Sequence, residues 1–173
     1  MTFKIHRINK TINRKSFDCG VKPLNEYFQK HARQNDEKGI GSCFVALDGN
    51  GAPVGYYVYS MAEVLKSSLP LEKARGIPGY PIGAIRIGRL ARDTSVRGKG
   101  LGDLLLKDCL GRIASLSENP DIPGFRFIVV DAKDQHASNF YQKFGFIPFL
   151  DQANALFIPL ETVKRANQRQ TKT

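Results

Sequence analysis

The stretch Arg97-Gly98-Lys99-Gly100-Leu101-Gly102 places three glycines within five positions, directly before a leucine-rich segment. Residues 84–91 (AIRIGRLA) before it read as a strand, and apolar residues recur at helical spacing from Leu101 onward. The first amides of a helix lack backbone partners and lie at the positive end of the helix dipole, so they attract anions. Glycines let the backbone approach a phosphate, and Arg97 and Lys99 add charge. The stretch therefore predicts a site for a phosphate-bearing ligand, with a purely structural tight connection as the alternative.

The glycine spacing differs from that of two widespread phosphate loops. It is neither the G-x-x-x-x-G-K-[ST] of nucleoside triphosphatases nor the G-x-G-x-x-G of dinucleotide-binding folds. No acidic residue follows a neighbouring strand at the position that binds a ribose in those folds. The preceding chain also reads as a hairpin rather than a strand–helix–strand unit. Both kinds of nucleotide site are therefore disfavoured.

The composition indicates a basic globular protein. The chain has 173 residues, enough for one domain, with 26 Lys and Arg against 16 Asp and Glu, for a net charge of +10. Such a surplus attracts nucleic acid, phosphorylated cofactors or an acidic partner, although part of it can serve solubility alone. Cys19, Cys43 and Cys109 form no disulfide or metal pattern, which fits a reducing cytoplasm. No segment has the roughly 18 apolar residues of a membrane span, and the N-terminal residues do not read as a signal peptide.

The order of elements predicts an α/β fold with a central mixed sheet. Strands are expected at 3–8, 43–48, 54–60, 84–91, 125–132 and 155–160, and helices at 23–34, from 101 onward, and at 134–146. Leu24, Tyr27, Phe28 and His31 are expected to share one face of the first helix. Asp134 reads as the N-cap and Gly145 as the C-cap of the last helix. Residues 61–81 have no clear assignment, and 164–173 read as a frayed basic tail.

Two separated motifs resemble the signatures of the GNAT acetyltransferases. Residues 97–102 match R/Q-x-x-G-x-G/A, and residues 140–146 (FYQKFGF) match F-Y-x-x-x-G-F. The resemblance implies a single GNAT domain over 1–163, whose mostly antiparallel sheet splays between its fourth and fifth strands, and a basic tail at 164–173. It also implies acetyl-CoA as the co-substrate, without a metal. The residues implied to bind it are Arg97, Gly98, Lys99, Gly100, Leu101 and Gly102 in the loop, the backbone of Leu90, Ala91 and Arg92, and Asn139.

Further residues resemble one subgroup of this family more closely than the family as a whole. Residues 16–34 (SFDCGVKPLNEYFQKHARQ), 54–57 (VGYY) and 88–93 (GRLARD) resemble the GNAT toxins of type II toxin–antitoxin modules. This implies a cytoplasmic enzyme that acetylates the α-amino group of aminoacyl-tRNA and blocks translation. The implied partners are a ribbon-helix-helix antitoxin and a second copy of the chain, with no membrane. The sequence departs from the subgroup at Arg92, usually apolar there, and in a longer loop at 117–125.

Tyr141 is the catalytic candidate. In the family this tyrosine donates its phenolic proton to the departing sulfur of CoA, and such positioned proton transfer contributes about 100- to 10,000-fold. The alternative is a core aromatic that pins the helix to the sheet, the role expected of Phe140, Phe144 and Phe146. An α-amino group has a pKa of about 8, so a neutral fraction is present without a strong protein base.

The remaining polar residues have broader readings. The candidates for tRNA contacts are Arg33, Lys38, Arg75, Arg86 and Arg89. A solvated surface or antitoxin contacts are the alternatives for each of them. The three histidines are too scattered for a metal site, and Asp93 and Asp131 are expected to make structural hydrogen bonds rather than to act as acid or base.

Two rival functions stay open from the sequence alone. One is a GNAT enzyme for another amine, such as a polyamine, an antibiotic or a protein N-terminus. The basic net charge disfavours a polyamine, which would require an acidic cleft. The other is a non-catalytic CoA-binding or DNA-binding regulatory module. The intact Tyr141 argues against lost catalysis, and no helix-turn-helix is evident.

Overall fold

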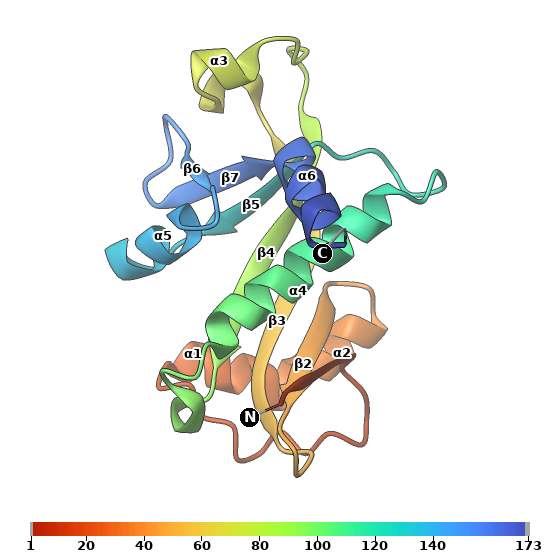
Figure 1. Cartoon of the computed structure of the whole chain (residues 1–173), viewed down its shortest axis with the longest axis vertical. Helices are drawn as coiled ribbons and strands as arrows, with labels where there is room; N and C mark the ends of the chain where they lie inside the picture. The colour runs from red at the N-terminus through yellow and green to blue at the C-terminus, as the bar shows by residue number, and fades with distance from the viewer. Residues whose placement is uncertain (1, 172–173) are drawn as a thin grey trace. The chain divides into compact units, whose positions relative to one another are not determined.

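The computed structural model describes residues 2–171, which build a seven-stranded mixed sheet with helices (Figure 1). The hydrogen-bonded strand order is β1-β2-β3-β4-β5-β7-β6. The strands are β1 (Lys4–Arg7), β2 (Ser42–Leu47), β3 (Pro53–Val64), β4 (Ile82–Arg92), β5 (Phe127–Asp131), β6 (Ile147–Pro148) and β7 (Ala155–Pro159). Strands β4 and β5 run parallel, whereas β1–β2, β2–β3, β5–β7 and β6–β7 pair antiparallel. The expected α/β fold with a mixed, mostly antiparallel sheet is confirmed.

The described chain divides into two compact units. The first unit comprises residues 2–60 and 88–109, and the second comprises 61–87 and 110–171. Strands β3 and β4 and helix α4 (Leu101–Ser117) each contribute residues to both units. On α4 the residues Leu101, Leu105, Cys109 and Ile113 are all buried, as their helical spacing predicts.

The N-terminal helical segment of the first unit contains a π-helical turn. Helix α1 (Lys22–Glu26) continues into η1 (Tyr27–His31) and then α2 (Ala32–Glu37). The amide of Ala32 donates to the carbonyl of Tyr27, five residues back. This wider turn inserts one residue, so Ala32 is buried with Tyr27 and Phe28 while His31 is exposed. The expected helix face was therefore wrong at His31.

Two side chains satisfy carbonyls of this irregular segment. The Arg14 Nε donates to the Phe28 carbonyl at 3.0 Å, and the Tyr56 hydroxyl donates to the Leu24 carbonyl at 2.8 Å. The Tyr56 ring also stacks on Phe28, with ring centroids 4.4 Å apart. Burial lowers the pKa of the Arg14 guanidinium and raises the pKa of the Tyr56 hydroxyl. The π-helical turn is thus built into the core of the first unit by aromatic packing and two polar anchors.

The second unit contains the elements whose assignment was open or different. Residues Met61–Val64 complete β3, and η2 (Lys66–Ser68) and α3 (Leu71–Ala74) follow. Helix α6 (Leu160–Thr171) replaces most of the expected frayed tail, and residues 172–173 lie outside the described part. Leu160 and Val163, one helical turn apart, are buried and anchor this helix.

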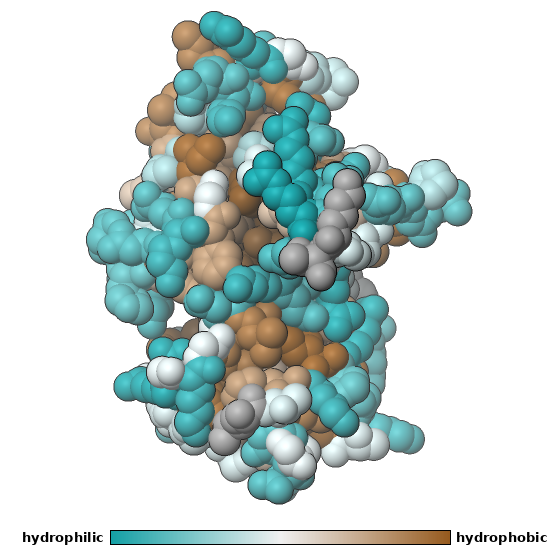
Figure 2. Space-filling view, viewed as in Figure 1, coloured by the Kyte–Doolittle hydropathy of each residue, from teal (hydrophilic) through white to brown (hydrophobic). Residues whose placement is uncertain are grey.

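The surface combines hydrophilic and hydrophobic areas, and both colours appear on the face drawn in Figure 2. Large apolar side chains that remain exposed in the second unit are Met61, Leu65, Leu71, Tyr80 and Leu150, and in the first unit Ile40 and Leu104. Within residues 2–171, none of the helices has the length and apolar character needed to cross a membrane.

Candidate functional site

The glycine-rich bend of the first unit has the backbone geometry of an anion site. Gly98 and Gly100 both have φ of +74°, which favours glycine, and a Cβ atom on either would meet open space. The amide of Leu104 donates to the Gly100 carbonyl at 3.1 Å, so α4 begins immediately after Gly100. The amides of its first turn precede this bond and lie where helices bind phosphates. Arg97 and Lys99 are exposed beside the bend.

Asp93 braces the chain that leads into this bend. It precedes the short 3-10 helix η3 (Thr94–Val96), and its Oδ1 accepts from the Ser95 amide at 2.9 Å. Its Oδ2 accepts from the Asp18 amide at 2.8 Å, and its own amide donates to the Val54 carbonyl at 2.8 Å. Asp93 therefore has the expected structural role, linking β3, β4 and the 17–20 segment at the entrance to the loop.

Asp18, whose amide donates to Asp93, extends this network through its own carboxylate. Its Oδ1 accepts from the Gly20 amide at 2.8 Å and from the Asn25 Nδ2 at 2.7 Å. Hydrogen bonds from Gly20 and then Asn25, with a smaller contribution from the positive charge of Arg97, hold the pKa of Asp18 below its ordinary value. A Cβ on Gly20 would lie 3.3 Å from the Arg97 Nη2. The Asp18–Gly20 turn therefore lies beside Arg97 at the entrance to the bend.

The predicted backbone contacts lie on β4, also in the first unit. Leu90 and Arg92 are half-buried, and Ala91 is buried in the cluster that contains Tyr56 and Phe28. The parallel register of β4 with β5 covers Ala84–Ile87 and no later residue of the described β4. This ending of the register agrees with the expected divergence of the fourth and fifth strands before Leu90.

Tyr141 of the second unit lies on α5 (Gln135–Gln142), and the end of this helix fixes its ring. The Phe146 amide donates to the Tyr141 carbonyl at 3.4 Å, and the Gly145 amide donates to the Gln142 carbonyl at 3.0 Å. With Gly145 at φ of +95°, these two bonds form a Schellman motif. The rings of Tyr141 and Phe146 meet edge to face at 5.5 Å, as that motif favours. The residues of FYQKFGF therefore cap α5 and hold the Tyr141 ring, which is 8% exposed.

The start of α5 agrees with its predicted cap. The Asp134 Oδ1 accepts from the Ala137 amide at 2.8 Å, so the N-cap prediction is confirmed. Asn139 is exposed two residues before Tyr141, and its Oδ1 accepts from the Gln135 Nε2 at 2.8 Å. The side-chain amide of Asn139 is thus oriented by Gln135, one helical turn earlier on the same helix.

The five candidate tRNA-binding residues divide between the two units. Arg33, Lys38 and Arg89 belong to the first, and Arg75 and Arg86 belong to the second. Arg33 pairs with Glu37 one helical turn on, and Lys38 and Arg75 are exposed. The Arg89 guanidinium lies over the Tyr27 ring, with its central carbon 3.6 Å from the centroid. Arg86 forms an ion pair with Asp131.

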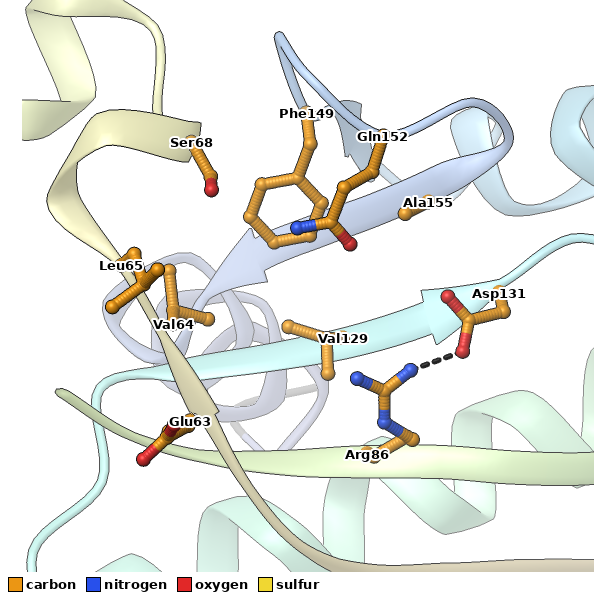
Figure 3. A pocket seen from close by; sticks show the side chains of 10 residues that line it. All are labelled: Glu63, Val64, Leu65, Ser68, Arg86, Val129, Asp131, Phe149, Gln152 and Ala155. Carbon is orange, nitrogen blue, oxygen red and sulfur yellow. Dashed lines mark hydrogen bonds and ion pairs between the residues drawn. The ribbon is translucent and has the colours of Figure 1, made fainter. Parts of the chain in front are cut away.

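The Arg86–Asp131 pair lies in a pocket of the second unit (Figure 3). The pocket measures about 160 Å³ and combines apolar walls with polar groups. Its lining residues are Glu63, Val64, Leu65, Ser68, Arg86, Val129, Asp131, Phe149, Gln152 and Ala155. Arg86 and Asp131 were predicted to have separate roles, and the sequence did not predict this pocket. Its lining comes from four separate stretches of the chain, 63–68, 86, 129–131 and 149–155, so no local motif could have indicated it.

The three cysteines give no indication of a nucleophilic or metal site within residues 2–171. Burial raises the pKa of Cys43 to about 12, so its thiol stays protonated and is a poor nucleophile at neutral pH. Cys109 is buried, and the half-buried Cys19 Sγ donates to the Val21 carbonyl at 3.7 Å. Across residues 2–171, no three His, Cys, Asp or Glu side chains gather in a metal-binding group.

Asp18 and Asn25 are two residues of this site for which the sequence predicted no role. Asp18-Cys19-Gly20 has the Asp-x-Gly pattern of a turn in which the aspartate accepts from the amide two residues on. That pattern could have predicted the turn. It could not have predicted that the turn contacts Thr94 and Arg97, which are more than 70 residues away along the chain.

Comparison with known proteins places these features in a family. Residues 39–148 match the acetyltransferase (GNAT) domain. A protein of Mycobacterium tuberculosis strain H37Rv named tRNA-acetylating toxin is 34% identical over 140 residues, covering 81% of each chain. A protein of Sinorhizobium fredii named probable toxin TacT is 28% identical and covers 88% of this chain and 87% of its own.

A solved structure shares both fold and extent with the chain. AtaT in complex with acetyl-methionyl-tRNAfMet superposes with a TM-score of 0.86 at 26% sequence identity, covering 95% of this chain and 99% of AtaT. The matched domain includes the glycine-rich bend, β4, β5 and α5, and the curated relatives match over most of their length. The chain therefore belongs to the GNAT family of acetyltransferases.

Proposed function

We propose that the protein is the toxin of a toxin–antitoxin pair and transfers the acetyl group of acetyl-CoA to the α-amino group of aminoacyl-tRNA. The observation that carries the choice of acceptor is the 34% identity, over 81% of both chains, to a relative named tRNA-acetylating toxin. The bend at residues 97–102 supports a phosphate-bearing co-substrate independently of that name. The net charge of +10 suits an anionic acceptor such as tRNA.

The residues of the bend fit the pyrophosphate of acetyl-CoA. The open space beside Gly98 and Gly100 is the volume that a Cβ would fill, and it leaves the backbone accessible to phosphate oxygens. In this proposal Arg97, Lys99 and the amides of Gly98, Gly100, Leu101 and Gly102 hold the pyrophosphate. The backbone of Leu90, Ala91 and Arg92 holds the pantetheine arm, and Asn139 contributes a further polar contact. Acetyl-CoA supplies an acetyl group that is activated as a thioester.

Tyr141 acts as the proton donor in this mechanism. Its phenolic O–H gives a proton to the sulfur that leaves as the carbon–sulfur bond breaks. The acceptor nitrogen loses one proton when its bond to the acetyl carbon forms. Tyr141 regains one proton in place of the one it gave to sulfur, so no net proton is gained or lost. Because an α-amino group has a pKa of about 8, about a tenth of it is neutral at pH 7, and no strongly basic side chain is required.

Arg33, Lys38, Arg75, Arg86 and Arg89 are proposed to contribute to tRNA binding, with different strengths. Lys38 and Arg75 are exposed, and neither forms an ion pair within residues 2–171. They can release phosphate counterions without first breaking an internal contact. Arg33 and Arg86 must exchange a carboxylate partner for a phosphate. We therefore expect Lys38 and Arg75 to contribute more to affinity than Arg33.

Protein partners form the last part of the proposal. Solved structures similar to this chain include AtaT with its antitoxin AtaR and the KacTA–DNA complex. We propose a ribbon-helix-helix antitoxin, a homodimer in its absence, and a cytoplasmic location.

The proposal is tested by transfer of labelled acetyl from acetyl-CoA to a pool of charged tRNAs. Uncharged tRNA and free amino acids serve as parallel acceptors. Label is expected on charged tRNA alone, and it should be lost with Tyr141→Phe but kept with Tyr80→Phe, which removes the same hydroxyl from an exposed loop. Label on free amino acids, and none on tRNA, would instead support a GNAT enzyme for a small amine.

A further inference from the structure

Arg89 of the first unit is a half-buried cation without a carboxylate partner. The central carbon of its guanidinium lies 3.6 Å from the centroid of the Tyr27 ring, and Arg89 forms no ion pair within residues 2–171. Burial removes part of the hydration of a charge, and a partner of opposite charge offsets that loss. A guanidinium that stacks on a ring can still bind an anion through the N–H groups along its edge. Arg89 is therefore a candidate contact for an anion that comes from outside the chain.

The Tyr27 ring is held firmly under this guanidinium. Tyr27 is buried and stacks on Tyr56 with centroids 6.4 Å apart, and Tyr56 stacks in turn on Phe28. The Tyr27 hydroxyl shares a hydrogen bond with the side chain of Asn35. The π-helical turn places the neighbours Tyr27 and Phe28 in one buried cluster, and such turns occur frequently at functional sites. The aromatic stack therefore fixes the plane on which the guanidinium lies.

A second arginine of the same unit provides a contrast. Arg7 also lies over a buried ring, that of Phe44, but at 6.0 Å, and its Nε donates to the Asp36 carboxylate at 3.1 Å. The carboxylate balances the charge of Arg7, so contacts within the chain explain its position. Arg89 instead contacts a neutral ring at a shorter distance. The difference indicates that Arg89 is oriented for a ligand.

The position of Arg89 on β4 indicates which ligand this is. Arg89 directly precedes Leu90, the first residue whose backbone is proposed to hold the pantetheine arm of acetyl-CoA. The thioester lies at the end of this arm, so the attacking amine must approach the same part of β4. In aminoacyl-tRNA that amine is separated by one ribose from the phosphate of the 3′-terminal nucleotide. The amine and this phosphate therefore arrive at the site together.

We propose that Arg89, held in place by the Tyr27 ring, binds the phosphate of the 3′-terminal nucleotide of aminoacyl-tRNA and so places the α-amino group for transfer. Tyr27 is the positioning residue. The inference rests on the proposed function and adds to it the contact that orients the acceptor. Two N–H groups of one guanidinium match two phosphate oxygens. The pyrophosphate of acetyl-CoA has its own proposed cations, Arg97 and Lys99.

The first test changes one phosphate of the acceptor. A tRNA assembled by ligation and charged with one amino acid carries either the natural linkage or a neutral methylphosphonate before its 3′-terminal nucleotide. The methylphosphonate should lower kcat/KM by about tenfold with the unmodified protein, the effect of losing a hydrogen bond to a charged group. It should cause little loss with Arg89→Gln. Equal losses with both proteins would overturn the proposal. No transfer to the natural charged tRNA, with acetyl-CoA bound, would overturn the proposed function itself.

The second test concerns the ring. Tyr27→Leu removes the aromatic surface and should abolish most of the difference between the two acceptors, whereas Tyr27→Phe keeps the ring and should keep the difference. Phe44→Leu removes the buried ring beneath Arg7 and is the matched control. It should keep the full difference even where its melting temperature falls. Loss of the difference in Phe44→Leu as well would reveal a general effect of destabilisation and overturn the role of Tyr27.

A third measurement separates the two sources of phosphate. Arg89→Gln should bind acetyl-CoA with unchanged affinity. For charged tRNA, the slope of log affinity against log salt concentration should decrease in magnitude by about 0.7 in this variant, as expected when one contact to a single-stranded phosphate is lost. Weaker binding of acetyl-CoA with an unchanged salt slope for tRNA would assign Arg89 to the co-substrate and overturn the proposal.

Discussion

The glycine-rich bend of the first unit and the Tyr141 helix of the second are held by different kinds of interaction. The bend is exposed, and polar contacts brace it from Asp93 and Asp18. Tyr141 is buried, and aromatic rings and a Schellman cap fix it. The phosphate subsite proposed at the bend would work through backbone N–H groups that face solvent, which suits polar support from the periphery. The proton donor proposed at Tyr141 would need one accessible atom, so the rest of its ring can pack in apolar surroundings.

The largest effect is expected from Tyr141→Phe, which removes the oxygen proposed as the proton donor and keeps the ring. The variant should lower kcat by about 100- to 10,000-fold and leave the dissociation constant of acetyl-CoA unchanged. Rapid-quench transfer assays and calorimetric titration with acetyl-CoA measure the two quantities. Near-normal kcat would mean that Tyr141 only packs against its neighbours. The difference between the two regions would then not reflect a division between binding and proton transfer.

Gly100→Ala should affect binding instead. At φ of +74° an alanine costs about 1–2 kcal/mol, which corresponds to roughly 5- to 30-fold weaker binding of acetyl-CoA if the bend must keep its shape. The rate at saturating acetyl-CoA should change little. Gly49→Ala, in the same unit but without a positive φ and with open space beside it, is the matched control. Unchanged affinity in Gly100→Ala would show that the bend does not hold the co-substrate.

Gly145→Ala tests whether the cap of α5 positions Tyr141. A Cβ there would lie 3.5 Å from Ile158, which is ordinary contact, so the cost comes from φ of +95° and should be about 1–2 kcal/mol. The melting temperature should fall by about 2–8 °C, and kcat should fall with it while acetyl-CoA affinity is kept. Gly79→Ala in an exposed loop should change neither. A loss of stability with full kcat would separate the cap from the placement of Tyr141.

Asp93→Ala should have the smallest effect of the four. It removes the acceptor for the Ser95 and Asp18 amides, a change comparable to loss of a helix cap at about 1 kcal/mol. Thermal unfolding and acetyl-CoA titration should show a melting temperature lower by about 2–4 °C and a few-fold weaker affinity. Asp93→Asn keeps one oxygen acceptor and should recover part of both. Equal behaviour of the two variants would mean that the brace does not depend on these hydrogen bonds.

Local patterns in the sequence determined most of the elements. The β-rich runs at 43–48 and 54–60 around a Gly-Asn-Gly turn, the helical spacing from Leu101, and the caps at Asp134 and Gly145 were sufficient, because each depends on neighbours within a few residues. The predictions failed where packing against distant residues decides the local structure. The π-helical turn at Tyr27–His31 depends on what packs against it, including Arg14 and Tyr56, and the segment after Leu160 becomes a helix because Leu160 and Val163 find a buried surface.

The sequence by itself determined the family and the chemistry, because the glycine-rich bend and FYQKFGF are contiguous motifs whose backbone geometry follows from glycine and helix capping. Only the tertiary structure decided which residues support them. The bonds of Asp18 with the segment at Asp93 join parts of the chain 75 residues apart. The pocket around Arg86 and Asp131 collects side chains from β3, η2, β4, β5 and the residues around β6 and β7. Such contacts arise when strand pairing and packing bring together residues that are far apart in the chain. The spacing of residue types along the sequence does not predict them.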